Sequence, residues 1–172
     1  DIPYTGSGIS ASRLAMNKVG SKDIFRRNNI PTPDYLVVPA EQSISEITKG
    51  VKGLKLPVVT KPVGNGSSIG ISIIQDYIGI KDAIEYTGCY SEEILVEEYI
   101  EGRELAVSIL NDKALPVIEI KTASGFYDYD AKYKSDKTQY IVLTSAAESS
   151  ETTLSHAVYK RVQELAVRAH NI

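Results

Sequence analysis

A lysine and a glycine-rich turn lie close together near the middle of the chain, at a spacing suited to binding phosphate. Lys61 ends an apolar run, and the turn at residues 64–68 (GNGSS) follows. Glycines let the backbone approach a ligand closely, and successive free N–H groups in such a turn form an anion-binding concavity. Ser67 and Ser68 add hydroxyl donors, and the Lys61 ammonium can reach a phosphate as a point charge. The pattern predicts either a phosphate-binding loop or the flexible tip of a hairpin, for which these residue types are equally suited.

The residues on either side of the turn predict the two strands of a hairpin. Residues 57–61 and 69–74 are short runs rich in Val and Ile, which is the composition of β-strands. The lysine precedes the glycines, whereas in a Walker A loop a Gly-Lys-Ser/Thr sequence ends the motif. If this loop binds phosphate, it therefore does so from a hairpin and not as a P-loop.

Acidic side chains occur inside two of the predicted downstream strands. Glu97 and Glu98 lie in the middle of the predicted strand at residues 94–100. Glu119 interrupts the apolar run of the predicted strand at residues 116–121. Because such runs are buried on at least one face, we expect Glu119 to be either a solvent-facing residue or a polar group in a cleft.

A third predicted strand, residues 104–110, alternates polar and apolar side chains with a period of two. This period places Glu104 and Leu105 on opposite faces, with Leu105 toward a core. The Asn-Asp pair at residues 111–112 predicts the turn that follows.

Residues 122–138 differ from the rest of the chain, because they are rich in aromatic and charged side chains and have no periodicity. Long connections without secondary structure of their own are usually functional or disordered, and the aromatic content argues against disorder. We therefore expect a mobile lid that becomes ordered when a ligand fills the cleft.

Helical periodicity and capping residues predict helices at residues 10–20, 21–28, 43–54, 80–87 and 151–170. Lys18 falls in the first, where a solvated helix lysine is the simplest interpretation. Ser149 or Ser150 is expected to cap the last helix, and His156 and His170 are expected on its surface. Strands and helices that alternate with antiparallel hairpins predict an α+β fold.

Composition excludes several functional classes. The chain has 172 residues, 42% of them hydrophobic and 24% charged, and a net charge of −3, which provides no basic surface for nucleic acid. No apolar run is long enough to span a membrane, and no signal peptide is visible. Cys89 is the only cysteine, which fits a reducing compartment, and with two histidines it makes a zinc site improbable. The chain begins with Asp and ends directly after a helical pattern, so we expect a fragment or a processed form.

Six segments in this order resemble the D-alanine–D-alanine ligase family of the ATP-grasp superfamily. They are IPYTGSG at 2–8, AMNK at 15–18, KP at 61–62 with GSSIG at 66–70, VEEYIEGRE at 96–104, LPVIEI at 115–120 and FYDYDAKY at 126–133. The resemblance implies an ATP-grasp fold. Residues 1–97 would be its central subdomain with a lead-in, and residues 98–172 an incomplete C-terminal subdomain with the lid at 122–138.

The resemblance also implies which residues hold ATP phosphates. Lys18 and Lys61 match the two family lysines that bind them from a helix and a strand. Gly66, Ser67 and Ser68 match the glycine-rich loop that folds over the triphosphate.

Other matched positions would hold the nucleoside. The Glu97 side chain and the Glu98 carbonyl would accept hydrogen bonds from the adenine amino group, and the Ile100 N–H would donate to a ring nitrogen. Glu104 matches the carboxylate that accepts both ribose hydroxyls.

Three positions match residues near the reaction itself. Lys132 would lie near the transferred phosphoryl group, and Tyr133 would hydrogen-bond Ser67. The implied reaction is ATP-dependent ligation of two D-alanines through an acyl phosphate, for peptidoglycan precursors in the cytoplasm. It would require Mg²⁺, whose ligands we expect outside this chain, so no metal ligand is assigned and the chain alone is expected to be inactive.

Three alternatives stay open: a ligase that joins D-alanine to D-lactate, one that joins it to D-serine, and a non-catalytic nucleotide-binding module. The tyrosine-rich run at residues 126–133 argues against the D-lactate type. The partners implied are the small molecules ATP and D-alanine, with no nucleic acid and no membrane. A homodimer of the full-length protein is compatible with the resemblance.

Overall fold

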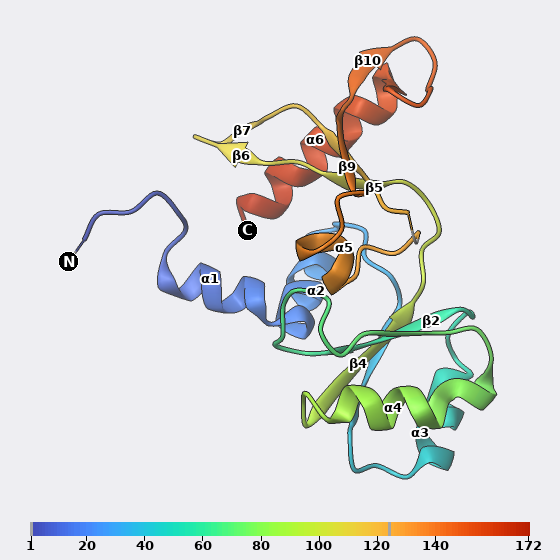
Figure 1. Ribbon diagram of the computed structural model, residues 1–172. Helices are drawn as coiled ribbons and strands as arrows, with labels where there is room; N and C mark the ends of the chain where they lie inside the picture. The colour runs from blue at the N-terminus through green and yellow to red at the C-terminus, as the bar shows by residue number, and fades with distance from the viewer. Residues whose placement is uncertain (1, 124) are drawn as a thin grey trace. The chain divides into compact units, whose positions relative to one another are not determined.

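The computed structural model describes residues 2–123 and 125–172. The chain divides into two compact units (Figure 1), each described here by itself. Unit 1 comprises Asp1–Arg27 and Pro31–Ile100, and unit 2 comprises Asn28–Ile30 and Glu101–Ile172. The predicted subdomain boundary after residue 97 falls inside a strand, and it stays a prediction. Residues 1 and 124, which belong to the predicted first subdomain and the predicted lid, lie outside the described residues.

A four-stranded antiparallel sheet forms the centre of unit 1. Its strand order is β1 (Tyr35–Pro39), β4 (Glu93–Glu98), β2 (Val58–Pro62) and β3 (Ser72–Ile74). The pairing of β2 with β3 confirms the predicted hairpin around the glycine-rich turn, with Val58 opposite Ile74. The sheet therefore places the turn at the ends of β2 and β3.

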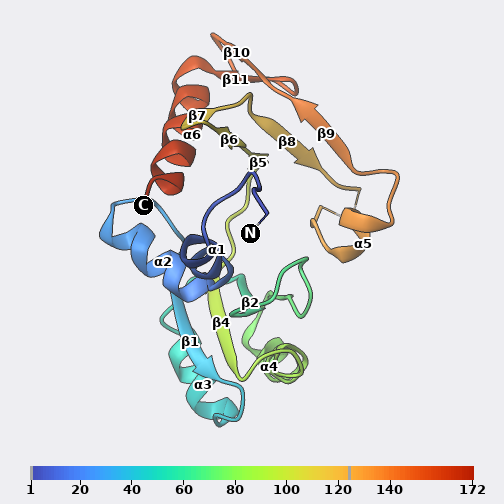
Figure 2. The same ribbon diagram turned by 90° about the vertical axis from the view of Figure 1, so that its left-hand side faces the viewer.

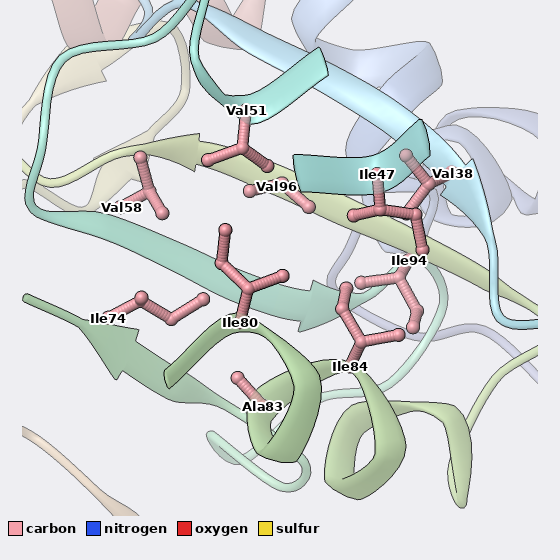
Figure 3. Packing of buried hydrophobic residues seen from close by; sticks show 10 residues of the cluster. All are labelled: Val38, Ile47, Val51, Val58, Ile74, Ile80, Ala83, Ile84, Ile94 and Val96. Carbon is pink, nitrogen blue, oxygen red and sulfur yellow. The ribbon is translucent and has the colours of Figure 1, made fainter. Parts of the chain in front are cut away.

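Helices α3 (Ile44–Val51) and α4 (Ile80–Gly88) pack on one face of this sheet. Figure 3 shows their side chains meeting those of the strands. The cluster consists of Val38, Ile47, Val51, Val58, Ile74, Ile80, Ala83, Ile84, Ile94 and Val96. Each fully buried Val or Ile contributes about 1.5–3 kcal/mol relative to exposure, so this face of the sheet holds unit 1 together. Ser43 caps α3 by accepting from the Glu46 N–H.

The segment before the sheet corrects one sequence prediction. The two helices predicted at residues 10–20 and 21–28 are present as α1 (Ile9–Met16) and α2 (Lys18–Arg27), but the break between them lies at Asn17 and not after Gly20. Asn17 separates them, because its backbone is extended and its side chain accepts from the Gly20 N–H at 2.9 Å. An Asn side chain that bonds nearby backbone ends one helix and begins the next. Lys18 is consequently the first residue of α2.

Unit 2 is built on a second antiparallel sheet, β5 (Glu104–Ala106), β8 (Ile118–Lys121) and β9 (Gln139–Val142). In Figure 2, β8 and β9 run beside each other. A parallel pair follows, β10 (Thr144–Ala146) with β11 (Thr153–Ser155), and then helix α6 (His156–His170). The small core consists of Val117, Leu143 and Leu154, with Leu105, Val107, Ile141, Tyr159 and Val162 against it.

The structure corrects the predicted strand at residues 104–110. It is divided into β5 and β6 (Ile109–Leu110), and β6 pairs with β7 (Lys113–Ala114). The predicted turn at residues 111–112 is confirmed, with positive φ at both residues. The alternation survives the break, because Leu105 packs against the core and Glu104 is exposed.

The last helix begins later than predicted. Its N-cap is Ser155, which accepts from the Val158 N–H, and not Ser149 or Ser150. Leu154 belongs to β11 and is buried there, because strand pairing with β10 takes the residues before the cap.

Candidate functional site

Strand alternation places the charged residues of unit 1 on the sheet face opposite α3 and α4. In β4, Ile94 and Val96 point into the core, so Glu97 points to the other face. In β2, Val58 points into the core, so Lys61 also points to the other face. Because β2 and β4 are antiparallel neighbours, the two charges lie diagonally beside each other.

Glu97 is the centre of a buried ion-pair cluster. Its Oε1 accepts from the Nζ of Lys61, and its Oε2 lies 2.7 Å from the Nζ of Lys22. The side chains of Glu97 and Lys22 are 9% and 8% exposed, whereas that of Lys61 is 26% exposed. One carboxylate therefore serves two ammonium groups, and Lys61 is the one that solvent reaches.

Helix α2 supplies the lysine that is buried. Lys22 follows Lys18 by one helical turn, so both side chains leave the same face of α2. The Lys22 ammonium also donates to the Thr32 hydroxyl at 2.6 Å and lies 5.0 Å from the centre of the Tyr35 ring. These contacts give a buried charge the partners that it needs.

Burial and like charges shift the ionisation of the cluster. Burial raises the pKa of the Glu97 carboxyl, but the ammonium groups of Lys61 and Lys22 outweigh it and hold this pKa below its usual value. Burial lowers the pKa of Lys22 despite its bond to Glu97. Burial and the nearby Lys61 lower the pKa of Lys18. The cluster thus has more positive charge than its carboxylate can balance.

Lys18 binds the start of the glycine-rich turn. Its ammonium donates to the carbonyl of Pro62 at 2.9 Å and to those of Val63 and Asn65, and its N–H donates to Val63 O at 3.1 Å. The interpretation of Lys18 as a solvated surface lysine is therefore wrong. The lysine is half-buried because the turn's carbonyl groups surround it.

Two serines of the turn have a left-handed backbone conformation. Ser67 and Ser68 have φ of 56° and 57°, in the left-handed region, and the Ile69 N–H closes the turn on Gly66 O at 3.2 Å. Within the turn, positive φ is therefore found at two serines and at neither glycine. A Cβ at Gly64 or Gly66 would meet no atom within 4 Å, so packing within the chain does not require glycine at these positions. The space above them suits the close approach of a ligand.

Two threonines fix the far end of the turn. The Thr87 hydroxyl donates to Gly70 O at 2.9 Å and bonds the Thr60 hydroxyl at 2.8 Å. Both threonines are fully buried. These bonds join helix α4, strand β2 and the residue after the turn.

The remaining predicted site residues of unit 1 lie at the end of β4. The Glu98 carboxylate accepts from the Lys55 N–H at 2.7 Å, so it points away from Glu97. Ile100 is 65% exposed. Their proposed contacts with adenine involve backbone atoms and stay predictions.

Unit 2 contains Glu104, Lys132 and Tyr133. Within the segment expected to lack secondary structure, α5 (Tyr129–Tyr133) forms, because the Asp128 side chain caps it by accepting from the Ala131 N–H. The Lys132 ammonium lies 5.0 Å from the centre of the Tyr127 ring. Whether this segment is a mobile lid stays a prediction.

Tyr127 connects α5 to the sheet of unit 2. Its hydroxyl bonds that of Tyr140 in β9 at 2.7 Å. This bond, burial and the nearby charges of Glu104 and Tyr133 raise the pKa of Tyr127 to about 12. Glu104, the predicted ribose ligand, and Tyr133, the predicted lid tyrosine, therefore both lie near the Tyr127 hydroxyl.

Glu119 does not face solvent, which was one of the two alternatives expected for it. Its carboxylate is buried and pairs with the Arg103 guanidinium in two bonds, at 2.8 and 2.7 Å. Arg103 also donates to the carbonyls of Ser150, Glu151 and Thr153. The hydrogen bonds from Arg103 hold the pKa of Glu119 below its usual value. The pair is thus a structural clamp between β8 and the loop before β11.

Sequence reasoning missed Lys22 and Arg103. The signal for Lys22 was its position four residues after Lys18 on a helix, which places both lysines on one face. Arg103 had no such signal, because its partner Glu119 is distant in sequence.

The side chains that most often bind metal ions do not cluster in the part of the chain that the structure describes. Among residues 2–123 and 125–172, no group of three His, Cys, Asp or Glu side chains is arranged to hold a metal ion. In the same part of the chain, no helix is long and apolar enough to cross a membrane.

The α+β fold belongs to the ATP-grasp class, as the sequence predicted. The structure resembles that of the D-alanine–D-alanine ligase of Bacillus anthracis with a TM-score of 0.77 and 32% identity, over 99% of this chain and 52% of that one. A structure of the ligase from the same organism complexed with ATP gives a TM-score of 0.76 at 26% identity, over 99% of this chain and 50% of that one.

The family follows from the sequence comparison. The chain belongs to the family described as D-ala D-ala ligase C-terminus, whose model matches residues 24–171. It is 39% identical to the D-alanine–D-alanine ligase of Acinetobacter baylyi over 98% of this chain and 52% of that protein. It is 40% identical to that of Marinobacter nauticus over 97% of this chain and 50% of that protein. The chain thus spans about half the length of these relatives.

Proposed function

We propose that this chain is the nucleotide-binding part of a ligase that joins two D-alanines at the expense of ATP. The observation that carries the proposal is the charge of the site in unit 1. Two ammonium groups, those of Lys22 and Lys61, share a single carboxylate, that of Glu97, and the ammonium of Lys18 is close enough to Lys61 for the like charge to lower its pKa. An excess of positive charge beside a glycine-rich turn favours a polyanion such as a triphosphate.

The chain's own residues would position the nucleotide. Lys61 and the N–H groups and hydroxyls of Ser67 and Ser68 would bind phosphate oxygens, and Gly66 would let them approach. Glu97 would accept from the adenine amino group through lone pairs that its lysine bonds leave unused. Glu104 would accept the ribose hydroxyls.

In the proposed reaction, a carboxylate oxygen of one D-alanine attacks the γ-phosphorus of ATP, and ADP leaves. The neutral amine of a second D-alanine then attacks the acyl phosphate carbon, phosphate leaves with the electrons of the C–O bond, and the nitrogen gives one proton to solvent or to the departing phosphate. Positioning and charge neutralisation account for most of the rate in such reactions. Lys132 would neutralise charge on the transferred group, and Tyr133 would bond Ser67. No step is assigned to Mg²⁺, which ligases of this class use.

The same proposal covers partners and location. The partners would be ATP and D-alanine, without nucleic acid or membrane, in the cytoplasm, where peptidoglycan precursors are made. The full-length protein would form a homodimer.

A phosphate-release assay on the gene product that contains this chain tests the proposal. ATP turnover that depends on D-alanine and yields D-alanyl-D-alanine supports it. The Lys61→Ala variant should raise KM for ATP and lower kcat together, while Lys81→Ala, an exposed lysine paired with Glu85, should match the wild type. Nucleotide binding without turnover would instead favour a binding module, and greater turnover with D-lactate or D-serine would favour the other ligases.

A further inference from the structure

Lys22 is the most buried ammonium group in the cluster, and none of the roles proposed above uses it. Its side chain is 8% exposed, so it cannot meet a nucleotide as Lys61 can. A buried lysine is costly unless its charge is balanced, so its presence calls for an explanation.

The contacts of Lys22 suggest an indirect role. Its ammonium lies between the Thr32 hydroxyl, at 2.6 Å, and Oε2 of Glu97, at 2.7 Å. It therefore occupies one carboxylate oxygen and turns the other, Oε1, toward Lys61. The Tyr35 ring, 5.0 Å from the ammonium, limits where it can move.

We infer that Lys22 is a positioning residue for the anion site: by sharing Glu97, it keeps the Lys61 ammonium from being fully neutralised and so available to phosphate. The inference deepens the proposed function and rests on it for the identity of the anion. With both lysines present, the set of Lys22, Lys61 and Glu97 carries one net positive charge. Without Lys22, Glu97 and Lys61 neutralise each other, and a phosphate competes directly with the carboxylate for Lys61.

The test uses Lys22→Gln, which keeps a hydrogen-bond donor and removes the charge. Binding of tripolyphosphate and of ATP to the 172-residue chain is measured by calorimetry, with Lys81→Gln as the matched control. We expect Lys22→Gln to weaken the binding of both ligands by at least about tenfold, because at an effective dielectric constant of about 20 one unit charge has an effect of that size even at about 12 Å. Lys81→Gln should bind as the wild type does.

A second variant separates positioning from plain charge. Thr32→Val preserves every charge and removes only the other acceptor of the Lys22 ammonium. It should weaken the binding of tripolyphosphate by about two- to threefold, because the Lys22 ammonium keeps its charge and its bond to Glu97 but loses one of the two groups that fix its position. Wild-type affinity in Thr32→Val overturns the positioning role, as does an affinity of Lys22→Gln within twofold of the wild type. If Lys22→Gln does not fold, Thr32→Val decides alone.

The titration of the Glu97 carboxyl carbon by NMR distinguishes this inference from the proposed function. Lys22→Gln should raise the pKa of Glu97, because one of the two cations that lower it is removed. An unchanged Glu97 titration overturns the inference even if the wild type binds ATP. If the wild-type chain binds neither ATP nor tripolyphosphate, the proposed function and the role of Lys22 in anion binding are both refuted. A raised Glu97 pKa in Lys22→Gln would in that case still establish the ion pair between Lys22 and Glu97.

Discussion

Replacement of Glu97 by glutamine should destabilise unit 1 strongly at neutral pH. The substitution removes two charge-assisted hydrogen bonds, each of which contributes about 1.5–3 kcal/mol. It also leaves the Lys22 ammonium buried without its charged partner, although its hydrogen bond to the Thr32 hydroxyl is kept. Removal of one partner of a buried ion pair costs about 3–5 kcal/mol, so we expect the free energy of unfolding of unit 1 to fall by that amount.

The effect should depend on pH with a definite sign. The pKa of Glu97 is lowered in the folded state. Ionised Glu97 therefore stabilises the fold above the unfolded-state value of about 4.3, and this contribution is lost as the pH falls through the lower folded-state pKa. The difference between wild type and Glu97→Gln should be constant from about pH 6 to 8 and shrink below about pH 4.

Hydrogen exchange followed by mass spectrometry suits this measurement, because it reports on peptides of β2 and β4 separately from unit 2. Glu85→Gln is the matched control, since Glu85 is 62% exposed and 3.7 Å from Lys81. Glu85→Gln should change the free energy of unfolding derived from hydrogen exchange by less than about 0.5 kcal/mol. A loss below about 1 kcal/mol in Glu97→Gln, or a loss that does not vary with pH, would refute the reasoning that the carboxylate balances buried charge.

Two further substitutions test the framework around the site. Gly70→Ala should destabilise unit 1 by about 2–4 kcal/mol, because φ of Gly70 is +72° and the new Cβ would lie 2.7 Å from Tyr90 and 2.8 Å from Pro62. An unchanged midpoint of urea unfolding would contradict this. Arg103→Gln should leave Glu119 buried without its charge partner and lower the stability of unit 2, measured by hydrogen exchange, by about 3–5 kcal/mol. Unaltered protection of β8 would show that the pair does not hold this part of unit 2 together.

Local patterns predicted the parts of this chain that local physics determines. The hairpin around the glycine-rich turn and the opposite faces of Glu104 and Leu105 follow from a period of two and from turn residues. The break between the first two helices was predicted after Gly20 and lies instead at Asn17, because it depends on one hydrogen bond from the Gly20 N–H to the Asn17 side chain.

The ion pairs of the site could not be predicted in the same way. Lys22 and Glu97 are 75 residues apart, and Arg103 and Glu119 lie on different elements. Their pairing is set by strand register and helix packing, which single-residue patterns do not encode. For the same reason, Glu119 was expected in solvent or in a cleft and is buried against an arginine.

The most direct test of the central claim is an ATP titration of the ¹⁵N-labelled 172-residue chain followed by NMR. If the lysine cluster and the glycine-rich turn form a triphosphate site, ATP should shift the amide resonances of residues 63–70 in the wild type. The same shifts should be reduced in Lys61→Gln and retained in Lys81→Gln. Shifts that are equal in all three proteins, or that are confined to other residues, would contradict the account.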